Sequence, residues 1–285
     1  MIDVIIPCFN SIKTLDKTLQ SIVTQSIKDK INVLLIDDCS SCSYDSFIDL
    51  YSKYIKIKLI KLNKNLGPGV AREQGMLATK NKYITFIDSD DFFYTSDALE
   101  QLLNKIEEGY DYVNSIEFEQ KNKRYSLLNC NVHGKLYRRK YLKDNNINFI
   151  NTMYHEDNYF NNLVILSGAK IGKIDTCTYY YTYNKSSITN VGEDAFPRLK
   201  IYIDNMNELI QISKDNKYNK NRVIRLIDEE LFYLRNIYNS INSKNKKTLI
   251  KWLKESNPDY LDIIFLDDLE FTNKLLFYTL DYIEE

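Results

Sequence analysis

The sequence lacks the features that mark membrane-spanning, secreted and nucleic-acid-binding proteins. No apolar stretch in its 285 residues approaches the length of about eighteen residues that spans a bilayer, so we expect no transmembrane segment. The N-terminal segment "MIDVIIPCFN" has no basic region followed by a long apolar run, so we expect no signal peptide and a cytoplasmic location, the inner membrane face included. The formal net charge is −1, so no overall basic field attracts nucleic acid.

Cysteine patterns typical of disulfide-rich or zinc-binding proteins are also absent. The five cysteines are an odd number, and a reducing cytoplasm would leave them unpaired. Cys39 and Cys42 in "CSSC" have the spacing of a redox or metal pair, but no second pair supplies two more zinc ligands. We therefore interpret them as two unbonded thiols in a loop. No internal repeat and no linker rich in Gly, Pro or Ser divides the chain.

Two kinds of segment alternate regularly over residues 3–109. Short apolar runs that end in polar residues predict strands at 3–10, 31–38, 55–62 and 82–91. Apolar residues at helical spacing predict helices at 11–26, 43–54, 67–80 and 96–109. Strands that alternate with helices predict an α/β fold with a mostly parallel sheet and helices on both of its faces.

Polar residues follow three of these strands at the same edge of the predicted sheet. The first strand ends in "PCFN", the second in Asp37 and Asp38, and the fourth in "DSDD", residues 88–91. Ligands of parallel α/β sheets bind beyond the carboxyl ends of the strands. We therefore expect a binding site at this edge.

Three carboxylates crowd the end of the fourth predicted strand, on Asp88, Asp90 and Asp91. Like charges at this spacing repel one another, and burying them without a partner costs more, so a positive group belongs beside them. Mg²⁺ and Mn²⁺ bind carboxylates together with phosphate oxygens. The alternative is that Asp90 and Asp91 only begin a turn and cap the next helix, for which one Asp is enough. The cluster therefore favours a divalent cation.

Five segments together resemble the family-2 glycosyltransferases of the GT-A fold. They are "VIIPCFN", "VLLIDDCSSCSYD", "NLGPGVAREQG", "YITFIDSDD" and "YHEDNYF", and both their order and their spacing match the family. The resemblance covers residues 2–190 and implies a GT-A catalytic domain, a mostly parallel sheet flanked by helices, over residues 1–193. We expect a helical C-terminal region over residues 194–285, where the periodicity is amphipathic.

The resemblance implies a donor site for a UDP-sugar. Phe9, with Pro7 beside it, would stack on the uracil ring, and Asp38 would bind the uracil edge. Arg72 would lie near the nucleotide. The complete donor-binding set that the resemblance implies is Pro7, Phe9, Asn10, Asp38, Arg72, Asp88, Ser89 and Lys185.

The same resemblance assigns the acidic strand end. Asp88 would approach the ribose or the phosphates, and Asp90 would bind Mn²⁺ or Mg²⁺, which neutralises the leaving diphosphate. The sequence departs from the family at "YYYTYNKSSIT", because Thr182 and Asn184 stand where basic residues usually contact the diphosphate. Lys185 can substitute with a compact charge. How the diphosphate is held is therefore open.

The second acidic motif, "HED" at residues 155–157, supplies the catalytic carboxylate in the family. The resemblance implies that Asp157 is the general base, that attack inverts the anomeric centre, and that Glu156 has a supporting role. From the residues alone, the alternative is that both acids are favourable charges in the first turn of a helix. His155 could orient the base or the acceptor, and His133 could be a ligand, because "VHGKLYRR" falls where family members often have Trp or Asn before "KLY". Both stay outside the predicted core site, because a single histidine is more often a hydrogen-bonded structural residue. The tyrosines of Tyr179–Tyr183 are typical of strand packing.

The sequence thus predicts an inverting, metal-dependent glycosyltransferase that moves a sugar from a UDP-sugar to a hydroxyl acceptor. The acceptor can be a surface glycan, a lipid-linked sugar, a protein or a modified nucleic-acid base, although the neutral net charge does not favour the last. The alternative is a catalytically impaired sugar-nucleotide-binding or scaffold protein, because the basic pair is missing. A nucleotidyltransferase is less favoured, because no Gly-rich basic loop follows the first strand. The sugar, the linkage and a homo-oligomeric state stay open.

Overall fold

The computed structural model describes most of the N-terminal two thirds of the chain. The described residues are 1–120, 122, 124–127, 131–184 and 195–213, with 218, 219, 221–223, 226, 244, 247, 248 and 251. The chain forms two compact units, of which the first comprises Met1–Val164 and Ala169–Val191. The second comprises Ile165–Gly168 and Gly192–Glu285. The domain boundary expected between residues 193 and 194 stays a prediction.

Strands and helices alternate along the first unit. The strands found among its described residues are β1 (Ile2–Cys8), β2 (Ile31–Asp37), β3 (Lys56–Lys61), β4 (Tyr83–Phe86), β5 (Phe92–Phe93), β6 (Tyr112–Glu119), β7 (Arg124–Leu127), β8 (Lys135–Arg138) and β9 (Ile171–Tyr181). The helices are α1 (Leu15–Val23), α2 (Asp45–Tyr51), α3 (Pro68–Ala78), α4 (Ala98–Glu107), α5 (Arg139–Asp144) and α6 (Glu156–Leu166), with a 3-10 turn at Lys28–Lys30. The last residues of α6 belong to the second unit.

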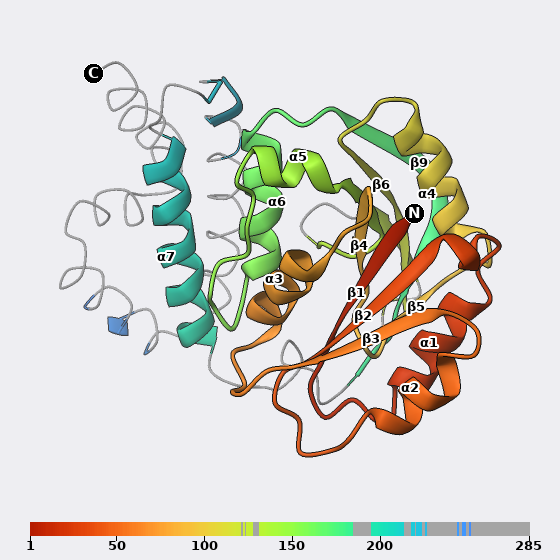
Figure 1. Cartoon of the computed structure of the whole chain (residues 1–285). Helices are drawn as coiled ribbons and strands as arrows, with labels where there is room; N and C mark the ends of the chain where they lie inside the picture. Colours follow the sequence, from red (N-terminus) through yellow and green to blue (C-terminus); the bar gives the residue numbers. More distant parts are fainter. Residues whose placement is uncertain are drawn as a thin grey trace. The chain divides into compact units, whose positions relative to one another are not determined.

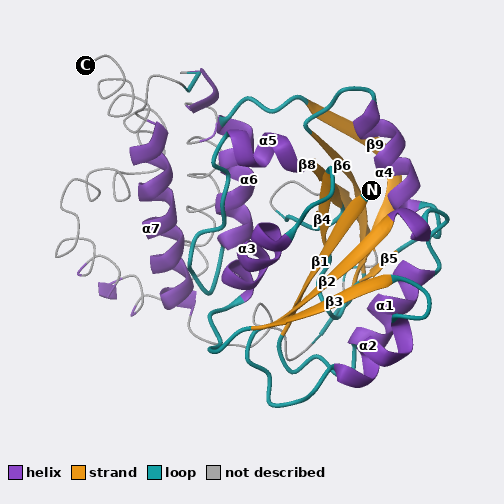
Figure 2. Cartoon of the chain, in the orientation of Figure 1, coloured by secondary structure: helices purple, strands orange, loops and turns teal. Residues whose placement is uncertain are grey.

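The strands form one sheet in the order β3-β2-β1-β4-β8-β6-β9-β5, with β7 paired to β6 (Figures 1 and 2). β3, β2, β1 and β4 run parallel, as predicted. β8 lies between β4 and β6 and runs antiparallel to both, so the complete sheet is mixed. The register pairs Ile5 with Phe86, where β4 ends, while β1 continues to Cys8 beside Asp37. The acidic segment 88–91 therefore begins at the carboxyl edge of the parallel strands.

Helices cover both faces of the parallel part of the sheet. Leu19 of α1 and Leu102 of α4 belong to one buried hydrophobic cluster with Val4 of β1. On the other face, α3 packs so closely on β1 that a Cβ added at Gly75 would collide with Ile5. Figure 1 shows α1 and α3 on opposite sides of these strands. This three-layer arrangement is the one predicted from the alternating segments.

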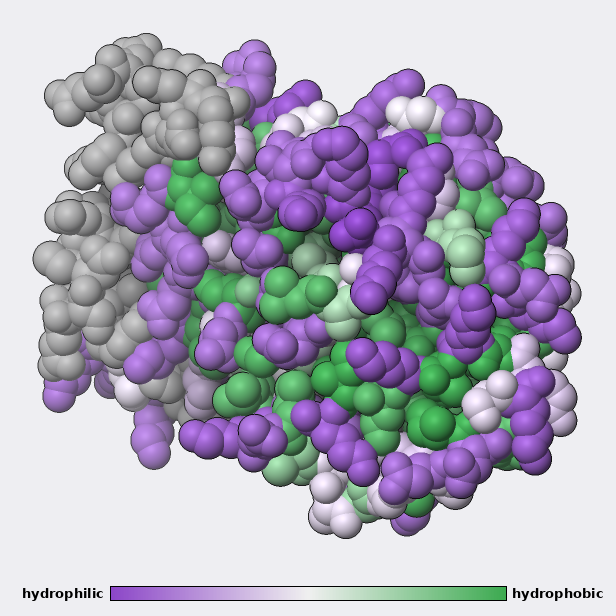
Figure 3. Space-filling view, in the orientation of Figure 1, coloured by the Kyte–Doolittle hydropathy of each residue, from purple (hydrophilic) through white to green (hydrophobic). Residues whose placement is uncertain are grey.

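The edge strand β3 is only partly covered. Ile57, Leu59 and Ile60 are half-buried, whereas Lys56 and Lys58 are exposed. On the face shown in Figure 3, hydrophobic side chains gather around this part of the sheet with hydrophilic side chains among them. Lysines on an edge strand disfavour pairing with a strand of another chain.

The second unit contains the helix α7 (Ala195–Ser213). Its buried apolar side chains recur at helical spacing, as the sequence predicts: Leu199, Tyr202, Ile203, Met206 and Leu209. The other amphipathic helices predicted in the C-terminal region lie outside the described residues, apart from scattered positions. Within the described part of the chain, no helix has the length and apolar character needed to cross a membrane.

Candidate active site

The loop after β1 is tied to the loop after β2. Asn10 has a left-handed backbone (φ 51°), and its Oδ1 accepts hydrogen bonds from the backbone N and the Oγ of Ser41, both at 2.9 Å. The backbone N of Asn10 donates to Ser40 Oγ at 2.9 Å. Phe9 is 50% exposed, and Pro7 is half-buried within β1. The Phe9 ring is therefore accessible to a ligand, whereas the Asn10 side chain shapes the loop.

Asp38 connects the ends of β1 and β2 with the start of α3. Its backbone N donates to Cys8 O at 2.8 Å. Its buried carboxylate accepts from Leu66 N at 2.9 Å and from Gly67 N at 2.8 Å. Gly67 has φ 88°, a conformation that glycine adopts without steric cost. Asp38 thus fixes the turn into α3, and its expected contact with uracil stays a prediction.

Arg72 of α3 joins the two acidic motifs. Its Nη2 donates to Asp88 Oδ1 and its Nη1 to Glu156 Oε1, both at 2.6 Å. The side chains of Arg72 and Glu156 are only 6% and 8% exposed, and that of Asp88 is 28% exposed. Glu156 is 84 residues from Arg72 in the sequence. The sequence predicts a positive group beside the carboxylates at the end of β4. The Arg72 guanidinium is such a group, supplied by the protein itself.

A glycine lets α3 come close enough to α6 for this contact. A Cβ added at Gly69 would lie 2.9 Å from Cβ and Cγ of Glu156 and 2.9 Å from Ile150 O. Real side chains do not approach so closely, so a larger residue would push the two elements apart. Glu156 is in the first turn of α6, where the positive end of the helix dipole also favours a carboxylate.

The buried charges shift one another's pKa. Burial opposes ionisation of both Arg72 and Asp88, but their mutual attraction prevails, raising the pKa of Arg72 and lowering that of Asp88. Burial, and then the Asp157 carboxylate, raise the pKa of Glu156 to about 7, although Arg72 acts in the opposite direction. Arg72 and Asp88 thus form an ion pair, while the pKa of Glu156, the second partner of Arg72, lies close to neutral pH.

Asp157 differs from Glu156 in its surroundings. It is half-buried, its Oδ1 accepts from Asn158 N at 2.7 Å, and it makes no ion pair with Arg72. Asn161 Nδ2 donates to the Asp157 carbonyl at 2.9 Å, and Asn161 Oδ1 in turn accepts from the buried Lys135 Nζ at 2.9 Å. Asn161 and Lys135 therefore hold the backbone of the first turn of α6 in place. The Asp157 carboxylate is less constrained than that of Glu156.

The other two carboxylates of the acidic segment contact the chain after β9. Asp91 is 1% exposed, and its carboxylate accepts from Tyr179 Oη at 2.6 Å and from Thr182 N at 2.7 Å. Burial, and then Asp88 and Asp90, raise the pKa of Asp91 well above its usual value. Asp90 Oδ2 accepts from Asn184 Nδ2 at 3.0 Å, and burial raises its pKa as well. Thr182 and Asn184, which replace the expected basic residues, thus contact the acidic segment.

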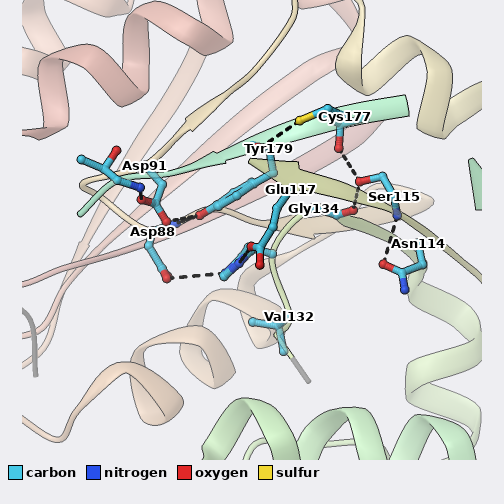
Figure 4. A network of polar contacts seen from close by, with 12 residues as sticks. Asp88, Asp91, Asn114, Ser115, Glu117, Val132, Gly134, Cys177 and Tyr179 are labelled. Carbon is cyan, nitrogen blue, oxygen red and sulfur yellow. Dashed lines mark hydrogen bonds and ion pairs between the residues drawn. The ribbon is translucent and has the colours of Figure 1, made fainter. Parts of the chain in front are cut away.

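Asp88, Asp91 and His133 each offer a ligand atom, and these atoms lie within 4.8 Å of one another. Two carboxylates suit Mg²⁺ or Mn²⁺, and imidazole is a common metal ligand, so this donor set fits a divalent cation. Figure 4 shows Asp88 and Asp91 of the acidic segment, Glu117 of β6 and Tyr179 of β9 converging on this region. Asp90 is outside the cluster, and its role as a metal ligand stays a prediction.

Three residues of this region belong neither to the predicted acidic cluster nor to the predicted site: Glu117, His133 and Tyr179. His133 is buried, its Nε2 lies 3.0 Å from Glu117 Oε2, and its ring stacks on Tyr179 with 4.1 Å between centroids. The sequence contains a signal for Glu117, because a charged residue interrupts the mostly buried strand β6. For His133 the sequence offers only its position before "KLY", which allows a ligand role, and for Tyr179 it indicates only strand packing. Of the remaining predicted residues, Ser89 is half-buried and Lys185 lies outside the described residues.

Comparison with protein families gives one match. A model described as glycosyl transferase family 2 matches residues 3–160, a segment that contains both acidic motifs and Arg72. The minor teichoic acid biosynthesis protein GgaA of Bacillus subtilis is 27% identical over 260 residues, which cover 79% of this chain and 56% of GgaA. The poly(ribitol-phosphate) beta-N-acetylglucosaminyltransferase TarS of Staphylococcus aureus is 28% identical over 199 residues, which cover 62% of this chain and 35% of TarS. The chain thus spans about half or less of the length of these curated relatives.

Solved structures share the fold. The crystal structure of S. aureus TarS 1-349 in complex with UDP-GlcNAc has a TM-score of 0.78 at 20% identity, covering 99% of this chain and 88% of that chain. The mannosyltransferase PcManGT from Pyrobaculum calidifontis, in complex with GDP-Man and Mn²⁺, has a TM-score of 0.64 at 13% identity. The match covers 99% of this chain and 85% of the mannosyltransferase chain. These similarities confirm the predicted GT-A fold.

Proposed function

Because the chain belongs to glycosyl transferase family 2, we propose that it transfers a sugar from a UDP-sugar to a hydroxyl acceptor. The observation that carries this proposal is the contact of both acidic motifs with one guanidinium, at 2.6 Å from Asp88 and 2.6 Å from Glu156. In glycosyl transfer, the leaving diphosphate and the attacking hydroxyl meet at one anomeric carbon. The carboxylates that serve the donor and the acceptor must therefore be neighbours, and Arg72 keeps them so.

We assign the general base to Asp157. Glu156 is buried and held by Arg72, so its oxygens are poorly placed to take a proton from a ligand. Asp157 adjoins it, is half-buried and is not paired with Arg72. Its carboxylate takes the acceptor proton as the hydroxyl attacks the anomeric carbon, and the bond to UDP breaks on the opposite face. The configuration at the anomeric carbon is inverted.

Mn²⁺ or Mg²⁺ would be held at the acidic segment by Asp88 and Asp91, with Asp90 beside them. When bound, the cation supplies positive charge that neutralises the diphosphate. Support comes from the donor set described above and from the Mn²⁺ complex of the structurally similar mannosyltransferase. The protein's own contribution is to fix these carboxylates through Arg72 and Tyr179 before a donor binds.

UDP-GlcNAc is the first donor to test, because TarS was solved with it and is named a beta-N-acetylglucosaminyltransferase. The half-exposed Phe9 ring is placed to stack on the uracil. The names of GgaA and TarS make a polyol-phosphate surface glycan the acceptor class that we propose.

The proposal is tested by incubating the protein with a panel of UDP- and GDP-sugars and Mn²⁺, and by measuring nucleotide release with and without a poly(ribitol phosphate) acceptor. We expect release from a UDP-sugar, faster with acceptor, and a loss of about 10²- to 10⁴-fold in Asp157→Asn. Binding of UDP-sugar without release under any condition would favour the catalytically impaired alternative. Preference for a GDP-sugar would refute the donor assignment.

A further inference from the structure

We propose that His133 is a ligand of the divalent cation and that Glu117 is the positioning residue that orients its imidazole. The inference rests on the proposed metal-dependent transfer and adds to it two residues that lie outside the acidic sequence motifs. Both side chains are buried, with His133 5% and Glu117 4% exposed. They come from β6 and from the segment that precedes β8, so the sheet itself brings them to the acidic segment.

The contact with Glu117 decides which ring nitrogen faces the acidic segment. His133 Nε2 lies 3.0 Å from Glu117 Oε2. An ionised carboxylate only accepts hydrogen bonds, so in the tautomer that this contact favours Nε2 carries the proton and Nδ1 has the lone pair. Metal-binding histidines commonly donate their other ring N–H to a carboxylate in this way, which fixes the tautomer and raises the basicity of the ligand nitrogen.

Nδ1 lies at a distance from Asp88 that suits a shared cation. The separation of His133 Nδ1 and Asp88 Oδ2 is 3.8 Å, too long for a hydrogen bond. Two ligand atoms that each lie about 2.1 Å from one cation are about 3 Å apart when adjacent and about 4.2 Å apart when opposite. The observed separation falls between these two values.

Tyr179 holds all three of these ligands in place. The His133 ring stacks on it with an interplanar angle of 11°. Tyr179 Oη donates to Asp91 Oδ2 at 2.6 Å and accepts from Asp88 N at 3.2 Å. The imidazole and both carboxylates are therefore fixed before a cation binds, which lowers the ordering cost of binding.

The charges of the region leave room for a cation. Asp88, Asp91 and Glu117 bring three carboxylates together, and Arg72, which faces Asp88, shares its charge with Glu156. The competing explanation is a doubly protonated His133 that pairs with Glu117 and Asp88 and needs no metal. The two explanations differ in one outcome: removing a metal ligand weakens Mn²⁺ binding, whereas removing a competing positive charge strengthens it.

The first experiment measures Mn²⁺ binding to the full chain in the presence of UDP, by the electron paramagnetic resonance signal of unbound Mn²⁺. His133→Phe keeps a ring to stack on Tyr179 and removes both nitrogens. We expect its Mn²⁺ affinity to fall at least tenfold, and that of Glu117→Gln to fall about 10- to 100-fold. Glu119→Gln, which removes a carboxylate from the same strand, is the matched control and should stay within twofold. Circular dichroism checks that each variant is folded.

The second experiment detects an imidazole ligand directly in the wild-type protein. The sequence has only two histidines, so protein labelled with ¹⁵N-histidine gives a simple pulsed electron paramagnetic resonance spectrum of bound Mn²⁺. We expect a coupling to imidazole nitrogen, and its loss in folded His133→Phe. Mn²⁺ binding without that coupling, or unchanged or tighter binding in His133→Phe, would overturn the inference and leave the proposed function standing. Donor binding is titrated separately with UDP and chelator. A wild-type protein that binds neither UDP nor Mn²⁺ would refute both this inference and the proposed function.

Discussion

Replacing Arg72 by Met should destabilise the protein more at high pH than at low pH. Met keeps much of the length of the side chain and removes the guanidinium, which leaves the carboxylates of Asp88 and Glu156 without their shared partner. Breaking a buried ion pair by removing one member typically costs about 3–5 kcal/mol, because the other charge stays buried.

The structure sets the size of this effect. Asp88 is 28% exposed and can be partly solvated, so most of the penalty falls on Glu156, which is 8% exposed. Glu156 already has its pKa raised to about 7, and the loss of Arg72 raises it further. Below that pKa the folded protein can neutralise Glu156 by binding a proton. We therefore expect a cost of about 3 kcal/mol at pH 8 and a clearly smaller cost at pH 5.5.

The assay is urea denaturation of the full chain at both pH values, followed by near-ultraviolet circular dichroism. Lys140→Met is the matched control, because Lys140 pairs with Asp144 in a surface ion pair whose side chains are 80% and 51% exposed. Such pairs contribute about 0–1 kcal/mol. In Arg72→Met combined with Glu156→Gln, part of the lost stability should return. A cost for Arg72→Met that matches the control, or that is the same at both pH values, would refute the description of Arg72 as a buried bridge.

Three further outcomes follow from the same contacts. Gly69→Ala should cost about 1–3 kcal/mol in thermal unfolding, because its Cβ would meet Glu156 at 2.9 Å. Since folding raises the pKa of Glu156 from 4.5 to about 7, the folded state binds a proton that the unfolded chain releases between these values, so wild-type stability falls as pH rises through this window. Urea denaturation of Glu156→Gln should show a fall that is smaller by up to about 3 kcal/mol. Asp90→Asn should reduce the extra thermal stabilisation by UDP with Mn²⁺, and an unchanged shift would remove Asp90 from the metal site.

The parallel part of the fold could be predicted because its signals are local. β1, β2 and β4 are apolar runs with polar ends, and the helices between them have regular periodicity, so each element is recognisable within about ten residues. The rest of the sheet, in which parallel and antiparallel pairs are mixed, could not be ordered from the sequence. β8 lies between β4 and β6, and β9 pairs with both β6 and β5, so these positions depend on contacts between distant segments.

The candidate site follows the same division. The motifs that contain Asp88 and Asp157 could be recognised because their residues are neighbours in the sequence. The pairing of Asp88 with Arg72 could not be predicted, because Arg72 is a single basic residue on a helix. The second residue that Arg72 contacts, Glu156, is 84 residues away in the sequence. The contact of Glu117 with His133 is hidden for the same reason, since the pairing of β6 with β8 creates it.

The most direct test of the account is the anomeric configuration of the sugar that Asp157 helps to release from a UDP-sugar. Proton nuclear magnetic resonance can follow slow hydrolysis of UDP-GlcNAc in water with Mn²⁺, which needs no acceptor, before the free sugar mutarotates. The account predicts that the first sugar to appear has the configuration opposite to that of the donor, and that Asp157→Asn releases it about 10²- to 10⁴-fold more slowly. A first product with the donor's configuration, or an undiminished rate in Asp157→Asn, would contradict it.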